Sequence, residues 1–131
     1  MKLLLDTHAL IWWLAADRQL SPAVVRLLDD PDNVIYVSAA SVWEIATKIR
    51  IGKLPGLEAL TSERDGILRI IDQEGFDPLA ITVEHAEVAG SLRGAHRDPF
   101  DRMLMGQSLI ENIPLASNEE IFDAFGVKRI W

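Results

Sequence analysis

Short runs of apolar residues alternate along the chain with longer mixed segments that carry helix-capping residues. Such runs are typical of buried parallel strands, which are covered on both faces. We expect strands at residues 3–5, 34–37, 79–81, 113–116 and 127–130. Because strands that alternate with helices form right-handed crossovers, the pattern predicts an α/β fold with a parallel sheet between two layers of helices.

Capping residues and turn formers mark the expected helices between these strands. Thr82 lacks the acidic partner of a full capping box, since His85 stands three residues on, so we expect its hydroxyl alone to cap. The predicted helices are one capped by Thr7 and ending near residue 15, one from Ser21-Pro22 to residue 28, one from Ser38 or Ser41 to residue 50 or 51, one over residues 57–73, one from Thr82 to residue 92, one from Asp98 to residue 111, and a short one capped by Ser117 that ends before Gly126.

Length and composition are those of an ordinary globular protein. The 131 residues suit a single domain over residues 1–131, with 49% hydrophobic and 25% charged residues. The absence of cysteine excludes disulfides, thiolate metal sites and cysteine nucleophiles. The start of the chain fits neither a signal peptide nor a membrane span, so we expect a cytoplasmic protein with no membrane contact. We expect the four tryptophans to serve the core or a dimer contact.

The net charge of −7 argues against nonspecific attraction to a polyanion. A nucleic-acid substrate would therefore need local positive charge, either from divalent cations in an acidic pocket or from basic rims. Two groups of basic residues are candidates for such rims: Lys48, Arg50 and Lys53, and Arg93, Arg97 and Arg102. The alternative is that these are solvated helix faces, with Glu44 and Lys48 forming an i,i+4 pair.

Acidic residues stand where predicted strands end and predicted helices begin. Asp6 directly follows the first strand, at the edge where ligands of open α/β sheets bind. Glu44, Asp98, Asp101 and Glu119 lie at or near the starts of later helices. Several carboxylates are the ligand set that Mg²⁺ or Mn²⁺ prefers, so together these positions suggest a metal-binding acidic pocket.

Each of these acids also has a purely structural interpretation. Glu44 would complete a capping box with Ser41, and Asp98 is an excellent N-cap for the helix that carries Asp101. Ser117 would form another box with Glu120, which leaves Glu119 in the first helical turn, where an anion is favoured. The metal interpretation becomes stronger when the positions are considered together, because Asp6 and Glu119 both follow strands of one parallel sheet.

Four segments, in order along nearly the whole chain, resemble the successive motifs of PIN-domain ribonucleases, especially the VapC-like toxins of type II toxin–antitoxin pairs. They are residues 3–10 (LLLDTHAL), 38–44 (SAASVWE), 96–104 (HRDPFDRML) and 115–119 (LASNE). The resemblance implies a three-layer α/β/α sandwich with a short central parallel sheet and a Mg²⁺- or Mn²⁺-dependent endoribonuclease. It also implies a homodimer and a cognate antitoxin protein that inhibits it.

Within the resemblance, Asp6 matches the first acid of the family, Glu44 the second and Asp101 the third, with Asp98 as a nearby extra carboxylate. The family's usual Thr-x-Asp after the fourth strand is replaced here by Ser117-Asn118-Glu119. Glu119 would keep a carboxylate, and Ser117 would support the metal shell or the substrate. For His8 and His96 we expect packing or hydrogen bonding instead of metal ligation.

The leading hypothesis is therefore cleavage of RNA by water that a bound ion activates, with Asp6, Glu44, Asp101 and Glu119 as the catalytic acids and Asp98 as a further metal ligand. A rival is a non-catalytic PIN-like module that binds a protein partner through its acidic cluster. A third hypothesis is a phosphatase-like hydrolase with Asp6 as nucleophile. Such an enzyme would usually need a second aspartate two residues after the first, where this chain has His8.

Overall fold

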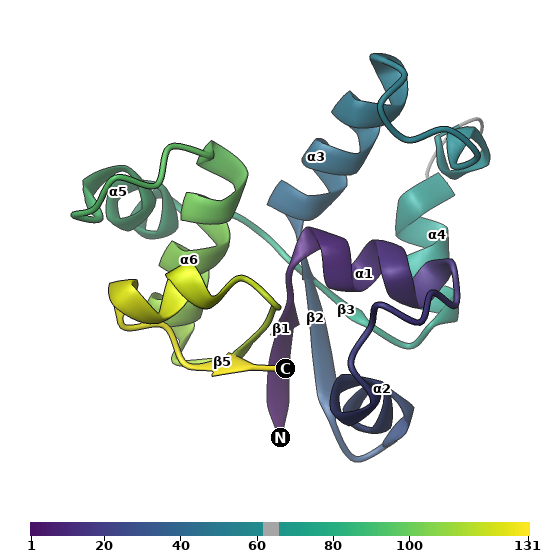
Figure 1. Cartoon of the computed structure of the whole chain (residues 1–131), viewed down its shortest axis with the longest axis horizontal. Coiled ribbons are helices and arrows are strands. Elements are labelled where there is room, and N and C mark those ends of the chain that lie inside the picture. The colour runs from purple at the N-terminus through teal and green to yellow at the C-terminus, as the bar shows by residue number, and fades with distance from the viewer. Residues whose placement is uncertain (62–65) are drawn as a thin grey trace.

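A parallel sheet forms the centre of the computed structural model, which describes residues 1–61 and 66–131 (Figure 1). Among these residues five strands pair in the order β3-β2-β1-β4-β5, and every pair is parallel. The strands are β1 (Lys2–Leu5), β2 (Val34–Ser38), β3 (Asp77–Leu79), β4 (Leu115–Ala116) and β5 (Arg129–Ile130). The predicted α/β class and parallel sheet are confirmed.

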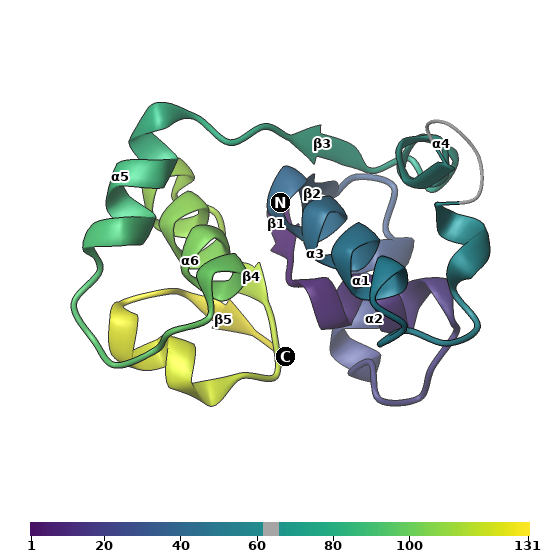
Figure 2. The same ribbon diagram turned by 90° about the horizontal axis from the view of Figure 1, so that it is seen from above.

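Helices cover both faces of this sheet, which gives the expected three layers. Figure 2 shows α5 and α6 on one side of the strands and α1, α2, α3 and α4 on the other. The helices are α1 (Thr7–Leu14), α2 (Pro22–Asp29), α3 (Ala39–Arg50), α4 (Gly66–Gln73), α5 (Val83–Ser91) and α6 (Pro99–Glu111), with 3-10 helices η1 (Glu58–Leu60) and η2 (Glu120–Phe125).

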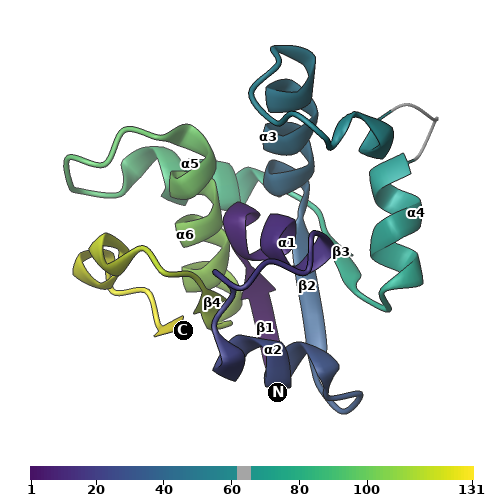
Figure 3. The ribbon, with the colours of Figure 1, turned by 45° about the vertical axis from the view of Figure 1, so that its right-hand side comes forward.

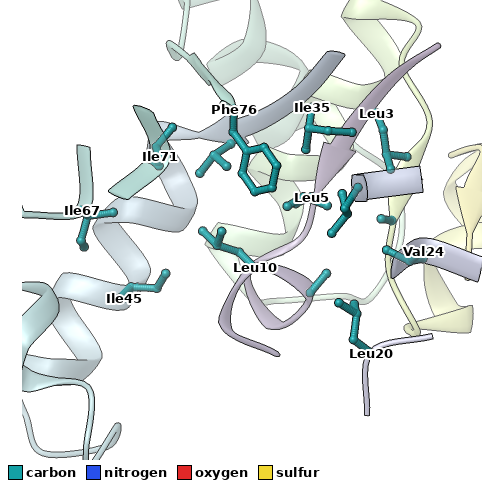
Figure 4. Packing of buried hydrophobic residues seen from close by; sticks show 14 residues of the cluster. Leu3, Leu5, Leu10, Leu20, Val24, Ile35, Ile45, Ile67, Ile71 and Phe76 are labelled. Atoms are coloured by element: carbon teal, nitrogen blue, oxygen red, sulfur yellow. The ribbon is translucent and has the colours of Figure 1, made fainter. Parts of the chain in front are cut away.

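The alternation of side chains along β1 divides the core into two clusters. Leu3 and Leu5 point to one face of the sheet and Leu4 to the other, because successive side chains of a strand leave on opposite sides. All three leucines are fully buried. The first cluster joins β1 and β2 to α1, α2, α3 and α4 (Figure 4), and the second joins Leu4 to α6 and the chain after it.

Close packing of α5 on α6 depends on Gly106 in the middle of α6. A Cβ atom there would lie 3.1 Å from the Ala89 nitrogen and 3.2 Å from the His85 carbonyl oxygen, both backbone atoms of α5. Backbone atoms cannot rotate away as a side-chain end can, so the two helices need glycine at this contact.

One helix start and one capping box differ from the sequence prediction. Asp6, and not Thr7, caps α1, and its carboxylate accepts from the Ala9 amide. Ser38 caps α3, which places Ser41 inside the helix, so the predicted capping box of Ser41 and Glu44 is wrong. The Glu44 carboxylate is thus released from a capping role.

Of two further caps, the hydroxyl of Thr82 caps α5 as predicted, although the absence of a full capping box was predicted incorrectly, and the cap predicted for Ser117 is wrong. Thr82 does form a complete capping box, because the His85 ring nitrogen Nδ1 accepts from the Thr82 amide as an acidic side chain would. Ser117 does not cap the last helix, since Glu119 holds the N-cap position of η2 with no side-chain cap bond. The end of η2 before Gly126 is confirmed.

Element boundaries shift in the middle of the chain. The strand expected at residues 79–81 is β3, which ends at Leu79. The single helix expected over residues 57–73 is wrong, because η1 ends at Leu60 and Thr61 is not helical. Residues 62–65 of that predicted helix lie outside the described residues. The strands expected at 113–116 and 127–130 are present but shorter.

In the part of the chain that the structure describes, no helix combines the length and apolar character needed to cross a bilayer.

Gly106 and Gly90 provide a matched test of helix packing. No atom lies within 4 Å of a Cβ at Gly90, which is on α5. We expect Gly106→Val to lower the free energy of unfolding by about 1–3 kcal/mol through overpacking, and Gly90→Val to change it by less than about 0.5 kcal/mol. Urea unfolding of both variants checks this, and equal effects would show that α5 and α6 do not pack as described.

Candidate acidic site

Asp6 lies at the junction between the end of β1 and the start of α1. Its Oδ1 accepts a 2.7 Å hydrogen bond from the Ala9 amide, and the residue is only 3% exposed. Burial raises the pKa of Asp6 to about 6; hydrogen bonds from Ser117 and Ala9 and the nearby His8 counteract the shift, and the charge of Asp101 adds to it. These hydrogen bonds fix the position of the Asp6 carboxyl, and because the group is removed from water, ionising it costs free energy.

Glu44 lies in the second turn of α3, which follows β2 without a loop. The side chain is buried, and its Oε2 accepts a 2.6 Å bond from the Lys48 ammonium one turn later. The other oxygen, Oε1, is buried without a hydrogen-bond partner, and no other side-chain atom in the described residues is in that state. A buried acceptor without a partner is expensive, and such atoms are frequent where a ligand or ion binds.

Asp101 lies in the first turn of α6, whose N-cap Asp98 accepts from the Asp101 amide. Its Oδ2 is 2.8 Å from the His96 Nε2. Burial is the largest cause of a raised pKa for Asp101; His96 acts to lower it, and the charges of Asp98 and Glu44 raise it further.

The predicted convergence of Asp6, Glu44 and Asp101 is visible in their electrostatics. The Asp101 charge acts on Asp6, and the Glu44 charge acts on Asp101. In Figures 1 and 3, β1 runs upward from the N-terminus, and α1, α3 and α6 all begin at that upper edge. Three helix N-termini therefore direct the positive ends of their dipoles toward the acids.

Asp98, Glu119 and Ser117 occupy different positions relative to these three acids. Asp98 is exposed and acts as the predicted N-cap, while Glu119 is exposed and follows the end of β4. Ser117 is completely buried; it hydrogen-bonds to Asp6, and its Oγ accepts from the Glu119 amide. The structure thus brings three acids and one serine together and leaves two carboxylates at the rim.

Two of the six candidate rim residues, Arg102 and Lys48, are engaged in contacts within the protein. The Arg102 guanidinium donates to the backbone oxygens of Ala89, His96 and Leu92, so its proposed place on an exposed rim is wrong. Lys48 forms the predicted i,i+4 pair with Glu44. Arginine N–H groups held by carbonyls are not available to phosphate, and this contact instead fixes the loop before Asp98.

Aromatic residues surround the acids. His96 packs edge-on against Phe122 and Phe125, and the exposed His8 packs against Trp12, so both histidines have the expected packing or hydrogen-bonding roles. Trp43 is 62% exposed and meets the Phe100 ring edge-on, so it does not lie in the core, and of its two expected roles only a dimer contact stays a prediction. Trp12, Trp13 and Trp131 are half-buried against the first cluster.

The donor set suits a hard divalent cation, although it is not closed around one. Within residues 1–61 and 66–131, no group of three or more histidine, aspartate or glutamate side chains is arranged to hold a metal ion as it stands. Three carboxylates at one edge, with raised pKa values at Asp6 and Asp101 and an unpartnered oxygen on Glu44, nevertheless have the chemistry of a Mg²⁺ or Mn²⁺ site.

Sequence reasoning expected hydrogen bonding for His96 and a supporting role for Ser117, but it missed the partners of these and other side chains near the acids. The hydroxyl of Thr7 donates to Ser41 at 3.0 Å and joins the start of α1 to α3. His96 holds Asp101, and Ser38 donates to Gln107 across the sheet. The i,i+4 spacing of Glu44 and Lys48 was a usable signal, whereas long-range pairs such as that of Thr7 and Ser41 have none in a single sequence.

Comparisons with known proteins agree with this architecture. The profile of the PIN domain family matches residues 3–128. The crystal structure of VapBC2 from Rickettsia felis bound to a promoter DNA fragment is similar, with a TM-score of 0.72 and 15% identity over 99% of this chain and 98% of that chain. No curated protein sequence matches.

Two further solved structures share the fold. A toxin–antitoxin complex from Klebsiella pneumoniae has a TM-score of 0.63 and 17% identity over 98% of this chain and 95% of that chain. The structure of FitAB bound to a DNA fragment has a TM-score of 0.65 and 20% identity over 98% of this chain and 93% of that chain.

The raised pKa of Asp6 predicts a pH-dependent stability difference. The folded state binds the Asp6 proton more tightly than the unfolded state, so the cost of its charge is absent below pH 4 and fully present above pH 6. Asp6→Asn keeps the cap acceptor and removes the charge. We expect it to raise the free energy of unfolding by about 1–3 kcal/mol at pH 7.5 and to change it little at pH 4.

Urea unfolding in EDTA at both pH values measures this difference. Asp98→Asn is the matched control, because Asp98 accepts from the third helical amide as Asp6 does but is exposed. It should have little effect at either pH. A destabilised Asp6→Asn variant at pH 7.5 would contradict the predicted charge burial.

Proposed function

The chain belongs to the PIN domain family, and from that membership we propose that it is a metal-dependent endoribonuclease, the toxin of a type II toxin–antitoxin pair. The observation that carries the proposal is the meeting of Asp6, Glu44 and Asp101 at one sheet edge, with a buried oxygen of Glu44 free of any hydrogen bond. The site favours hydrolysis of a phosphodiester, because buried acids paired with a hard cation suit that reaction.

The residues that would hold Mg²⁺ or Mn²⁺ are Asp6, Glu44 and Asp101. Asp98 and Glu119 are exposed, and we propose that they could add ligands from the edge of the site. When bound, such an ion would supply positive charge to the phosphate and lower the pKa of a water molecule. Side-chain rotation would have to bring the three acids closer together, since no closed group is present.

The chain's own residues position the reacting groups. Asp6 is held by the Ala9 amide and by Ser117, so its carboxylate has a defined orientation. His96 fixes one oxygen of Asp101 and leaves the other available. Because these contacts exist before RNA binds, they limit the side-chain rotation that is still needed to bring the carboxylates together.

We further propose that the chain works as a single cytoplasmic domain over residues 1–131, forms a homodimer and is inhibited by an antitoxin protein. Support for the antitoxin comes from the structural neighbours, which are toxin–antitoxin complexes. An apolar groove of about 540 Å³ between α3, α4 and β3 also suits a protein partner; its lining includes Trp43, Leu68 and Leu79.

That groove also favours a second candidate, a PIN-like binding module without nuclease activity. The two candidates differ in their response to metal. A ligand set relieved of carboxylate repulsion gains stability with excess Mn²⁺, whereas a module that uses its acids for protein binding shows no metal-linked shift in Tm.

The nuclease proposal predicts that Asp6→Asn abolishes RNA cleavage while the fold is retained, because the amide keeps the shape of the side chain but loses the ligand charge. We expect a loss of at least about 100-fold in rate. Cleavage of a single-stranded RNA is measured with Mg²⁺, with Mn²⁺ and with EDTA, and circular dichroism checks the fold.

Asp29→Asn is the control, since Asp29 is exposed on α2 and precedes β2 at the opposite end of the sheet. This variant should cleave at the wild-type rate. Cleavage that proceeds equally in EDTA, or that survives in Asp6→Asn, would exclude the metal-dependent mechanism.

A further inference from the structure

We propose that Lys48 is a positioning residue that holds Glu44 so that its unpartnered oxygen faces the ion, an inference that rests on the proposed function. Lys48 lies on α3, one turn after Glu44, and its ammonium is 2.6 Å from the Glu44 Oε2. The same carboxylate has its Oε1 buried and without a partner. One oxygen is therefore anchored by the chain, and the other is left for a ligand.

The other two acids also have an oxygen that the chain itself holds. Asp6 uses Oδ1 to accept from the Ala9 amide, and Asp101 uses Oδ2 to bind His96. In many metal sites a further residue orients a metal ligand by a hydrogen bond to the ligand's other polar atom. In the described part of this chain, each of the three converging acids has such a residue.

Glu44 depends more on its anchor than the two aspartates do. Glutamate has one more rotatable bond than aspartate, so it has more rotamer freedom to lose when it is fixed. Asp6 also has a second contact, from Ser117. The contacts described for the Glu44 carboxylate come from Lys48 alone, and both oxygens are otherwise enclosed by protein.

A positioning role and a role as a mere counter-charge predict effects of opposite sign. If Lys48 acted only through its charge, its removal would make the pocket more negative and would tighten cation binding. If it orients Glu44, its removal frees the longest ligand and weakens binding. The Lys48 side chain is 31% exposed and that of Glu44 only 4%, so solvent weakens the charge effect while the geometric effect remains.

The variants Lys48→Met and Lys48→Ala remove the anchor, and Lys48→Arg retains both the charge and an N–H donor. The matched control is Lys2→Met, because Lys2 is an exposed lysine at the opposite end of β1 from Asp6. Mn²⁺ affinity is measured by calorimetry on the whole chain. RNA cleavage is then followed as a function of Mn²⁺ concentration, and thermal unfolding monitors the fold of each variant.

We expect the Mn²⁺ dissociation constant to rise about 10-fold to 100-fold in Lys48→Met and Lys48→Ala, with most of the affinity recovered in Lys48→Arg. Lys2→Met should bind Mn²⁺ as the wild type does. At saturating Mn²⁺ the cleavage rate of Lys48→Met should approach that of the wild type, because the bound ion itself then fixes Glu44.

Unchanged or tighter Mn²⁺ binding in both neutral variants would overturn the positioning role and leave the nuclease proposal in place. Absence of Mn²⁺ binding in the wild type would overturn both. If Lys48→Arg binds as weakly as Lys48→Met, the anchor is not a charged N–H donor and the inference is wrong.

Discussion

Repulsion among buried carboxylates is the constraint on which the rest of this structure depends. Asp6 and Glu44 are each only 3% exposed, and Asp101 interacts with both. Burial of like charges costs free energy, and apolar packing around the charges does not offset this cost. The fold tolerates this cost through oriented backbone amides, the N-termini of three helices and two basic side chains, Lys48 and His96.

A parallel sheet is well suited to assemble such a site. All of its strands end at the same edge, and each crossover starts a helix there, so residues far apart in the chain meet. The strict alternation along β1, with Leu4 in one core and Leu3 and Leu5 in the other, holds this edge rigidly between two helical layers.

Much of this arrangement could be predicted from the sequence, since strand runs and caps are local signals. The class, the parallel sheet and the positions of Asp6, Glu44 and Asp101 followed from such signals and from the family motifs. Competing local choices were harder. Thr7 was as good a capping candidate as Asp6, but β1 ends at Leu5 and α1 begins at Thr7, so the N-cap position falls on Asp6. His96 and Ser117 were expected to form hydrogen bonds or support the site, but their partners Asp101 and Asp6 were not predicted, because no single sequence displays such contacts.

The replacement of the family's usual threonine and aspartate by Ser117 and Glu119 shows how the site divides its tasks. Ser117 keeps the hydroxyl, is fully buried and bonds to Asp6, so it belongs to the support of the first acid. Glu119 is exposed and contributes only its backbone amide to Ser117. A longer carboxylate at an exposed rim has more rotamer freedom and weaker repulsion from its neighbours than a buried aspartate would have. Of the three acids that meet at this edge, Asp6 and Glu44 are buried and Asp101 is partly buried, and the helix N-termini and Lys48 offset part of their negative charge.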